Sequence, residues 1–348
     1  MSKITLFQND RNWQTIRDQV LDLVDQEHAL GTAQNGNLVR QLERRLAKIY
    51  NRKHCITVAN CTDALVIALR ILNLPHASLV AVSNYTFTAT AHAVARAGYR
   101  VVPVDVTDQY CIDVDKIPAD VQAVVNVDLF GNMSDWSKLE ALGIPVINDA
   151  AQSLESHDGH AWSAQRGVVS CVSFSPSKTI SSWGSGGALL TDNDDIAEFA
   201  CRLRLHGKLT NDAPAIDAGL NSMLSSFEAA CIWAGLDHAA QWQARRDSIA
   251  RHIADTSKYV CGTDFTLPKH THHKLVFQAE DRAQAVADLK SAGIDAPVHY
   301  KLMINDELLY YTPQVFDNSD RLKRQSFTVP NQHTLTDDEV EQIAKALR

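Results

Sequence analysis

From residue 54 to about 206, short apolar runs alternate with segments of helical periodicity, and this alternation restricts the possible folds more than any other feature of the chain. The runs at 79–83, 123–129 and 144–149 have the length and composition of buried strands, and helical segments such as 62–72 separate them. Strands that alternate with helices build a mainly parallel sheet with helices on both faces. The sequence therefore predicts an α/β fold whose ligands bind beyond the carboxyl ends of the strands.

Further helices and strands are expected on both sides of this alternating region. They are helices at 10–30 and 36–50, a long helical stretch at 225–255, a strand at 274–278, a helix at 281–292, a strand at 295–299 and a helix at 336–347. The pattern changes after the long helical stretch, and a chain of 348 residues is long enough for two domains. We predict a large domain at 1–235, with the N-terminal helices and the sheet, and a small C-terminal α/β domain at 236–348.

Composition and charge narrow the possible partners. The formal net charge of −8 argues against a nucleic acid as partner. The seven cysteines form no Cys-x-x-Cys motif, so we expect free thiols in a reducing cytoplasm rather than disulfides or a zinc site. The first residues contain no apolar signal core, and no apolar run approaches the ~20 residues that span a bilayer. These observations predict a cytoplasmic protein without a membrane partner.

Asp149 and Lys178 are the residues that most directly indicate a chemistry. Asp149 ends the apolar run at 144–149, and Lys178 lies between a serine-rich turn and the glycine-rich segment 184–187. A lysine amine can form a Schiff base with the aldehyde of pyridoxal phosphate, and a carboxylate can keep the ring nitrogen of that cofactor protonated, so that the ring withdraws electrons. A lone lysine would indicate only a solvated surface charge. The aspartate and lysine in this order and context predict a pyridoxal phosphate site.

A candidate phosphate-binding turn lies at 58–65, where a strand is followed by a helix. Free backbone N–H groups at the start of that helix can bind a phosphate, and the hydroxyls of Thr62 and Ser173 can add hydrogen bonds. The alternative is that Asn60 and Thr62 only cap the helix. The presence of the Asp149–Lys178 pair favours phosphate binding.

Several short motifs follow one another along nearly the whole chain. They are Gly36-Asn37-Leu38-Val39, Asn60-Cys61-Thr62-Asp63, Thr86-Phe87-Thr88, Asp149-Ala150-Ala151-Gln152, Ser173 to Lys178, Gly219-Leu220-Asn221 and His299-Tyr300. In this order they resemble the sugar aminotransferases of the DegT/DnrJ/EryC1/StrS family. The resemblance implies the aspartate aminotransferase fold, which is fold type I of the pyridoxal-phosphate-dependent transferases. It has a mainly parallel seven-stranded sheet in the large domain and a small C-terminal α/β domain.

The resemblance also implies roles for residues around the cofactor. The turn at Cys61 and Thr62 and the hydroxyl of Ser173 would bind the cofactor phosphate, with Cys61 where the family usually has glycine. Phe87 would stack on the pyridine ring, and Gln152 would bond the ring hydroxyl. The expected cofactor is pyridoxal 5′-phosphate, and no metal is expected.

The substrate side and the subunit interface are implied in the same way. Asn221 would reach the cofactor phosphate of the other subunit, so that a homodimer shares its active sites. Met223 stands where the family usually has the arginine of an interface contact. His299 and Tyr300, followed by Lys301 in place of the usual proline, would face the substrate.

The expected reaction is an amino transfer from an amino acid, glutamate, to a keto sugar that carries a nucleotide. Lys178 would act as the general base of the proton shift. Enzymes of this fold that act on dicarboxylic amino acids anchor the substrate carboxylate with a small-domain arginine, but no arginine lies between Arg282 and Arg321 here. The residues at 299–301 suit a hydroxyl-rich sugar and its diphosphate instead.

Other functions stay open at this point. A sugar dehydratase on the same scaffold would, by resemblance, carry histidine in place of Lys178, and a regulatory protein could retain the cofactor without catalysing a reaction. The cluster of His270, His272 and His273 could bind a metal, but a polar loop before the strand at 274–278 is the expected structure.

Overall fold

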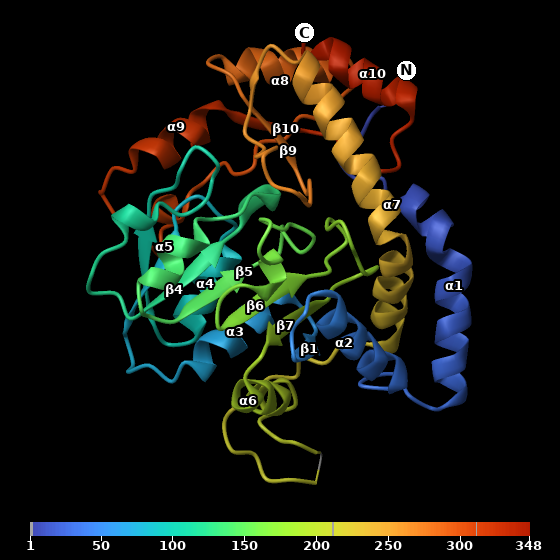
Figure 1. Cartoon of the computed structure of the whole chain (residues 1–348), viewed down its shortest axis with the longest axis vertical. Helices are drawn as coiled ribbons and strands as arrows, with labels where there is room; N and C mark the ends of the chain where they lie inside the picture. The colour runs from blue at the N-terminus through green and yellow to red at the C-terminus, as the bar shows by residue number, and fades with distance from the viewer. Residues whose placement is uncertain (1–2, 211, 311) are drawn as a thin grey trace.

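A seven-stranded sheet forms the centre of the structure, a computed structural model that describes residues 3–210, 212–310 and 312–348 (Figure 1). Its strands are β1 (His54–Val58), β2 (Leu79–Ser83), β3 (Arg100–Val104), β4 (Ala123–Val127), β5 (Val146–Asp149), β6 (Val169–Ser173) and β7 (Gly187–Thr191). They lie in the order β1-β7-β6-β5-β4-β2-β3. Strand β7 runs antiparallel to β1 and β6, and the other neighbouring pairs are parallel. The predicted mainly parallel α/β sheet is confirmed.

Side chains from both faces of the sheet are buried against helices. The helices between its strands and after β7 are α3 (Cys61–Ile71), α4 (Ala89–Arg96), α5 (Trp136–Ala141) and α6 (Asp194–Arg204). Cys171 and Leu189 belong to the apolar cluster that includes α3 and α6 residues, whereas the adjacent Val172 and Ala188 belong to a different cluster. Successive residues of a strand point to opposite faces, so both faces are covered, which explains why the strands are almost wholly apolar.

The carboxyl ends of the central strands lie at one edge of the sheet. Asp149, the last residue of β5, is in register with Val127 in β4 and with Cys171 in β6. Ser173, the last residue of β6, is in register with Gly187 in β7. The predicted site residues at these strand ends are therefore neighbours.

The helices α1 (Asn9–Ala29), α2 (Asn37–Ile49) and α7 (Ser226–Thr256) pack beside the sheet. Helix α1 lies along α7, and α7 extends from the sheet to the C-terminal part of the chain (Figure 1). The predicted boundary between residues 235 and 236 falls inside α7, which passes through it as one helix. The division into two domains at that point stays a prediction.

The C-terminal part holds a small antiparallel sheet of β8 (Val260–Cys261), β9 (Leu275–Gln278) and β10 (Ser326–Val329), with β9 in the middle. Its helices are α8 (Arg282–Ser291), α9 (Asp317–Gln325) and α10 (Asp337–Ala346). The strand predicted at 295–299 is wrong, because Ile294 makes only an isolated bridge to Ile4 and no strand follows it. Pro297 lacks the N–H that a central strand needs, and β10 pairs with β9 instead. Short 3₁₀ helices lie at Val114–Lys116, Leu129–Gly131, Ser163–Gln165 and Ile304–Asp306.

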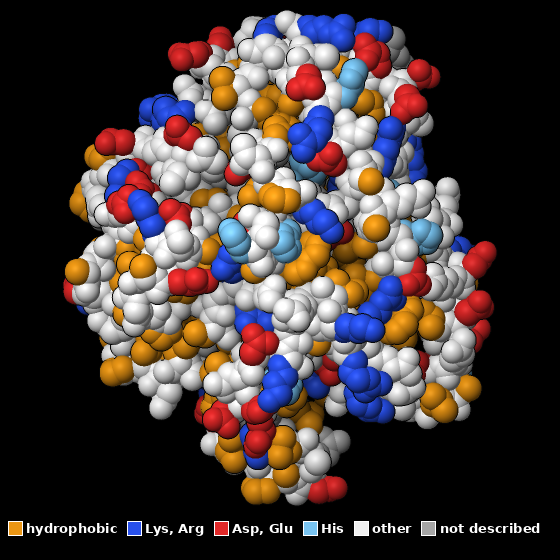
Figure 2. Space-filling view, viewed as in Figure 1, with side chains coloured by type: hydrophobic (Ala, Val, Ile, Leu, Met, Phe, Trp, Pro, Cys, Tyr) orange, Lys and Arg blue, Asp and Glu red, His pale blue; other side chains and the backbone are white. Residues whose placement is uncertain are grey.

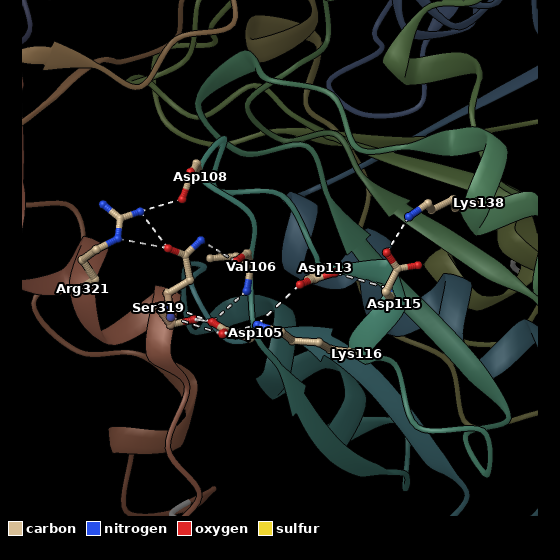
Figure 3. Close-up of polar contacts among 10 residues, drawn as sticks. Asp105, Val106, Asp108, Asp113, Asp115, Lys116, Lys138, Ser319 and Arg321 are labelled. Atoms are coloured by element: carbon tan, nitrogen blue, oxygen red, sulfur yellow. Dashed lines mark hydrogen bonds and ion pairs between the residues drawn. The ribbon is translucent and has the colours of Figure 1, made fainter.

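The carboxylate of Asp105, directly after β3, attaches α9 to the large sheet (Figure 3). Phe316, which precedes α9, has no side-chain group that could cap this helix. Asp105 caps it from a distant part of the chain: Oδ1 accepts hydrogen bonds from the N–H and the hydroxyl of Ser319, at 2.8 and 2.7 Å. Its Oδ2 accepts from the Asn318 N–H at 3.2 Å and from Lys116 Nζ at 2.8 Å. These first-turn N–H groups have no partner within their own helix, so the contact fixes the position of α9.

The surface carries charges of both signs. Figure 2 shows acidic and basic side chains interspersed over one face of the protein. Over the whole sequence, 41 Asp and Glu residues outnumber 33 Lys and Arg residues, so the excess charge is negative. None of the helices in the described ranges has the length and apolar character needed to span a membrane.

Candidate active site

A cavity of about 380 Å³ lies at the carboxyl ends of the central strands. Residues of the large sheet, α3 and α4 form part of its wall, and residues just before β9 and at 299–300 form another part. Most of the predicted site residues line this cavity: Cys61, Thr62, Phe87, Asp149, Gln152, Ser173, Lys178, His299 and Tyr300. Asn221 and Lys301 do not line it.

Asp149 is buried at the end of β5, and few groups stabilise its charge. Its Oδ2 accepts a hydrogen bond from Thr90 Oγ1 at 2.9 Å, and its Oδ1 accepts one from the Ala151 N–H at 3.2 Å. Burial raises the pKa of Asp149, and the two hydrogen bonds and the charge of Lys178 offset this only in part. A positively charged ligand group, such as a protonated ring nitrogen, would give this carboxylate the partner it lacks.

Lys178 lies in the turn after β6, where its backbone N–H donates to the carbonyl of Ser175 at 2.9 Å. Burial lowers the pKa of its amine, although Cys61 and Asp149 oppose the shift. A neutral amine is the form that attacks an aldehyde and accepts a proton, so the cavity favours both predicted roles of Lys178. Burial also raises the pKa of the Cys61 thiol well above its usual range, which keeps this neighbour uncharged.

The start of α3 forms one corner of the cavity. Asn60 caps this helix, because its Oδ1 accepts a hydrogen bond from the Asp63 N–H at 2.8 Å. The next N–H groups, at Cys61 and Thr62, are those that a helix start offers to a phosphate. Gly187 packs so closely against this turn that a Cβ atom there would lie 2.5 Å from the Asn60 carbonyl carbon and 2.6 Å from Cys61 N. Only glycine allows this approach of β7 to the candidate phosphate-binding turn.

Gln152 connects the sheet to the C-terminal wall of the cavity. Its Nε2 donates to Tyr300 Oη at 2.9 Å, and its Oε1 accepts from the Phe130 N–H at 3.2 Å and lies 2.9 Å from His273 Nδ1. The other ring nitrogen of His273 lies 3.1 Å from the carbonyl oxygen of Ser177. Protein groups therefore already fix the Gln152 amide, and its predicted bond to a ring hydroxyl stays a prediction.

Phe87 and Tyr300 form the aromatic part of the wall. Their ring centroids are 5.9 Å apart, and Phe87 is 54% exposed, so one face of its ring is open to a ligand ring. Tyr300 stacks on Phe130, with centroids 6.4 Å apart. The Tyr85 hydroxyl fixes the His-Tyr pair, because it donates to the His299 carbonyl at 2.5 Å and accepts from the Tyr300 N–H at 3.2 Å.

His299 belongs to the cavity wall, whereas Lys301 lies outside it. The Nδ1 atom of His299 lies 3.1 Å from Thr328 Oγ1 in β10. Burial and two nearby lysines lower the pKa of His299 to about 4, so its imidazole is neutral at pH 7. Lys301 is exposed and lines a neighbouring hollow of about 570 Å³, which shares Phe7 and His299 with the cavity.

Asn221 is exposed beside the candidate phosphate-binding turn of its own chain. The adjacent Ser222 is buried and donates from its hydroxyl to Asp63 Oδ2 at 2.8 Å, and the N–H of Ala59 donates to Ser222 Oγ at 3.1 Å. These bonds fix the segment next to the start of α3. The predicted contact of Asn221 with the cofactor phosphate of a second subunit stays a prediction.

Phe7 and Lys274 also line the cavity, although the sequence did not indicate them. Their signal was weak, because a lysine at the start of an apolar run is usually solvated. The three histidines of the segment before β9, at 270, 272 and 273, are all buried. The described part of the chain contains no group of three or more His, Cys, Asp or Glu side chains placed to hold a metal ion.

The side chains of this cavity fit pyridoxal phosphate. The start of α3 and the Ser173 hydroxyl suit its phosphate, the underpaired Asp149 suits a protonated ring nitrogen, and the Lys178 amine suits an aldehyde. The fold and this set of groups define a class of α/β enzymes that bind a phosphorylated aldehyde cofactor.

Comparison with known proteins identifies the family within this class. The model of the DegT/DnrJ/EryC1/StrS aminotransferase family matches residues 14–348, and the chain belongs to this family. It is 32% identical over 299 residues to the UDP-2-acetamido-2-deoxy-3-oxo-D-glucuronate aminotransferase of Pseudomonas aeruginosa, and the match covers 82% of each chain.

Two solved structures show the same fold. A DegT/DnrJ/EryC1/StrS aminotransferase from Brucella abortus has a TM-score of 0.93 and 25% identity, with 99% of this chain and 98% of that chain covered. NtdA from Bacillus subtilis, solved with bound cofactor PMP, has a TM-score of 0.91 and 22% identity, with 100% of this chain and 85% of that chain covered.

Proposed function

We propose that this protein transfers an amino group from an amino acid, glutamate, to the keto group of a nucleotide-linked sugar, with pyridoxal 5′-phosphate as cofactor. The observation that carries the proposal is the cavity that Asp149 and Lys178 share, in which the carboxylate is underpaired and burial lowers the pKa of the amine. Family membership supports the amino transfer. The name of the Pseudomonas relative supports a nucleotide-linked keto sugar as the acceptor.

The groups on the cofactor side have separate tasks in this reaction. When bound, the cofactor supplies an aldehyde that reacts with amines and a ring that withdraws electrons. The start of α3 and the hydroxyl of Ser173 would bind the phosphate, and Phe87 would orient the ring. Asp149 would keep the ring nitrogen protonated. Lys178 Nζ would hold the resting cofactor and then move the proton of the transfer, a role favoured because burial lowers the pKa of its amine.

The acceptor side is assigned to His299, Tyr300 and Lys301. Burial lowers the pKa of His299 and raises that of Tyr300, so an uncharged imidazole and a phenol meet the sugar hydroxyls. Lys301 lines the adjoining hollow, where its ammonium suits a diphosphate. The cavity and the hollow share two residues, which supports a substrate that extends from one into the other.

We also propose a cytoplasmic homodimer with shared active sites. Asn221, exposed beside the phosphate-binding turn, supports a contact with a second subunit. Free cysteines, most of them buried, suit a reducing compartment. Inactive Lys178→Ala and Asn221→Ala chains should regain part of the activity when they are mixed and re-assembled. A fully active monomer at assay concentration would contradict the sharing of sites.

Absorbance spectroscopy of the cofactor-loaded protein tests the amino transfer. Glutamate should remove the absorbance of the lysine-bound cofactor and release 2-oxoglutarate. The resulting pyridoxamine form should then convert a member of a panel of nucleotide-linked keto sugars to an amino sugar. No response to any amino acid would favour a regulatory protein, and a dehydrated sugar without an added amino group would favour a dehydratase.

Steady-state kinetics test the nucleotide requirement. We expect a higher kcat/KM for the nucleotide-linked keto sugar than for the free sugar, and equal values would point to a free sugar ketone. Lys301→Ala should raise KM for the linked sugar more than it lowers kcat. A diphosphate contact far from the reacting carbon stabilises the bound substrate and the transition state equally.

A further inference from the structure

A second lysine lies in the cavity, and the proposed reaction gives it no task. Lys274 directly precedes β9 and lines the same cavity as Lys178. It is 4% exposed, and its Nζ has no hydrogen-bond partner within the described ranges. Its closest aromatic contact is Phe7, whose ring centroid lies 4.1 Å from Nζ. A buried amine without a polar partner needs an explanation, because desolvation without a hydrogen bond is unfavourable.

The contacts of His273 place Lys274 close to Lys178. Its ring nitrogens lie 2.9 Å from Gln152 Oε1 and 3.1 Å from the carbonyl oxygen of Ser177. Because Ser177 precedes Lys178 and His273 precedes Lys274, these contacts bring both lysines to one region of the cavity. Burial lowers the pKa of Lys274 well below its usual range, and the charge of Lys178 adds to this shift.

No carboxylate oxygen bonds Lys274 Nζ in the part of the chain that the structure describes. Asp149, in the same cavity, accepts from the Thr90 hydroxyl and a backbone N–H. The ionisable groups that interact electrostatically with Lys274, namely Lys178, His273 and His299, are basic. Asp149 is therefore the one carboxylate among the described residues that line the cavity, and it does not bond Lys274 Nζ.

We propose that Lys274 binds a carboxylate of the reactant in the active site. An incoming carboxylate would supply the partner that the amine lacks, and a charge-assisted hydrogen bond is strong in a buried site. The face of the Phe7 ring would support the resulting ammonium group. The proposal rests on the proposed function, and it fills a gap there, because no arginine lies between Arg282 and Arg321.

Two reactants of the proposed reaction can carry this carboxylate. The amino donor brings an α-carboxylate with every amino acid, and the sugar acceptor brings one if it is a uronic acid. The donor and the acceptor react in separate half-reactions, so each can be measured without the other.

Lys274→Met in the cofactor-loaded protein separates these sources, and Lys345→Met, at an exposed position in α10, is the control for the loss of one positive charge. If the donor is the source, the dissociation constant for glutamate should rise roughly 10- to 100-fold, the range for one hydrogen bond to a charged group. If the sugar is the source, the pyridoxamine form should lose the same factor for a nucleotide-linked keto sugar with a C6 carboxylate, and nothing for the same sugar with a C6 hydroxymethyl group. Unchanged constants in both half-reactions would overturn the proposal.

Thermal unfolding of the cofactor-free protein separates binding from a structural role. Methionine in place of a buried unpaired amine should leave Tm unchanged or raise it, whereas loss of a structural lysine would lower it. Glutarate, used as a carboxylate probe, should raise the Tm of the wild type and of Lys345→Met but not of Lys274→Met. A lowered Tm with a normal response to glutarate, or borohydride trapping of the cofactor on Lys274, would contradict the assignment. If the wild type reacts with no amino acid or keto sugar, the proposed function fails, and the glutarate response still tests Lys274.

Discussion

Asp105 and Asp149 lie at the ends of two strands of the same sheet, and both are buried, at 4% and 5% exposed. Asp105 accepts hydrogen bonds from three backbone N–H groups, one hydroxyl and one ammonium. Among the residues that the structure describes, Asp149 accepts only from one hydroxyl and one N–H. Burial opposes ionisation of both, but the hydrogen bonds lower the pKa of Asp105 to about 2, while burial raises the pKa of Asp149. Asp105 has more donors than Asp149 and is less strongly desolvated, and both differences lower its pKa relative to that of Asp149.

The difference separates a carboxylate that holds the fold together from one that awaits a ligand. The partners of Asp105 come from the start of α9, from Lys116 and from the adjacent Val106 N–H, and they leave it fully paired (Figure 3). Asp149 shares a cavity with Lys178 and Lys274, whose amines have pKa values lowered by desolvation. Underpaired ionisable groups that gather in one cavity are typical of functional sites, whereas paired ones are typical of contacts that hold one part of the fold to another.

The largest effect is expected at Lys178, on the cavity side of this comparison. Lys178→Ala should leave a folded protein that does not turn over, because one amine both holds the cofactor and carries the proton. Borohydride reduction and mass spectrometry should find the cofactor on Lys178 in the wild type and on no residue in the variant. An adduct on another lysine would contradict the assignment of Lys178 as the residue that binds the cofactor.

Asp149→Asn should retain the cofactor but lose about a hundredfold or more in kcat/KM, since an amide cannot keep a ring nitrogen protonated. The cofactor-free variant should be as stable as the wild type or more so. The pKa of Asp149 is higher in the folded state than in the unfolded state. The stability that its protonated form contributes is fully present below the unfolded pKa and is lost as pH rises through the folded pKa. At pH 7 the carboxylate therefore lowers the stability of the fold. Steady-state kinetics and Tm test both parts, and near-normal turnover would make Asp149 a structural residue.

Asp105→Asn should have the opposite profile, with a loss of stability of about 1–3 kcal/mol at pH 7 and near-normal kcat for the folded fraction. The lowered pKa of Asp105 adds stability above its unfolded value, about 3.9, and this is lost as pH falls toward about 2. The Tm difference from the wild type should therefore be constant from pH 7 to pH 5 and shrink below pH 4. A difference that grows in acid would show that Asp105 is not held as an anion.

The sequence predicts the cavity around Asp149 better than the contact between Asp105 and α9. The strands of the large sheet have both faces buried and are almost wholly apolar, so β5 and β6 and the residues at their ends, Asp149 and Ser173, could be located from the local pattern. Lys178 could be found because its chemistry and its neighbours in the sequence are distinctive.

The rest depends on contacts between distant segments. Helix α9 has a mostly polar sequence, and its cap is Asp105, more than 200 residues earlier in the chain. Strand β10 pairs with β9 across a long insertion, which is why the sequence placed a strand at 295–299 instead. Lys274 is buried and contacts the ring of Phe7, which lies more than 260 residues earlier, so its burial is invisible in its local sequence.

The smallest effect is expected at Lys116. Its substitution distinguishes the two kinds of partner that Asp105 has, the ammonium group of Lys116 and the N–H groups at the start of α9. Its side chain is half exposed, so Lys116→Met should cost less than about 1 kcal/mol, and the loss should decrease at high salt. Lys138→Met is the matched control, because Lys138 pairs with Asp115 on the surface and its loss should leave Tm unchanged (Figure 3). If Lys116→Met lowered Tm as much as Asp105→Asn, the Lys116 ammonium rather than the N–H groups of α9 would be the principal partner of Asp105. A cation at the surface would then be enough to stabilise a buried carboxylate. If it lowers Tm only slightly, the helix start is the principal partner of Asp105. Asp149 then differs because, in the described ranges, its carboxylate accepts from the Thr90 hydroxyl and the Ala151 N–H and from no helix start.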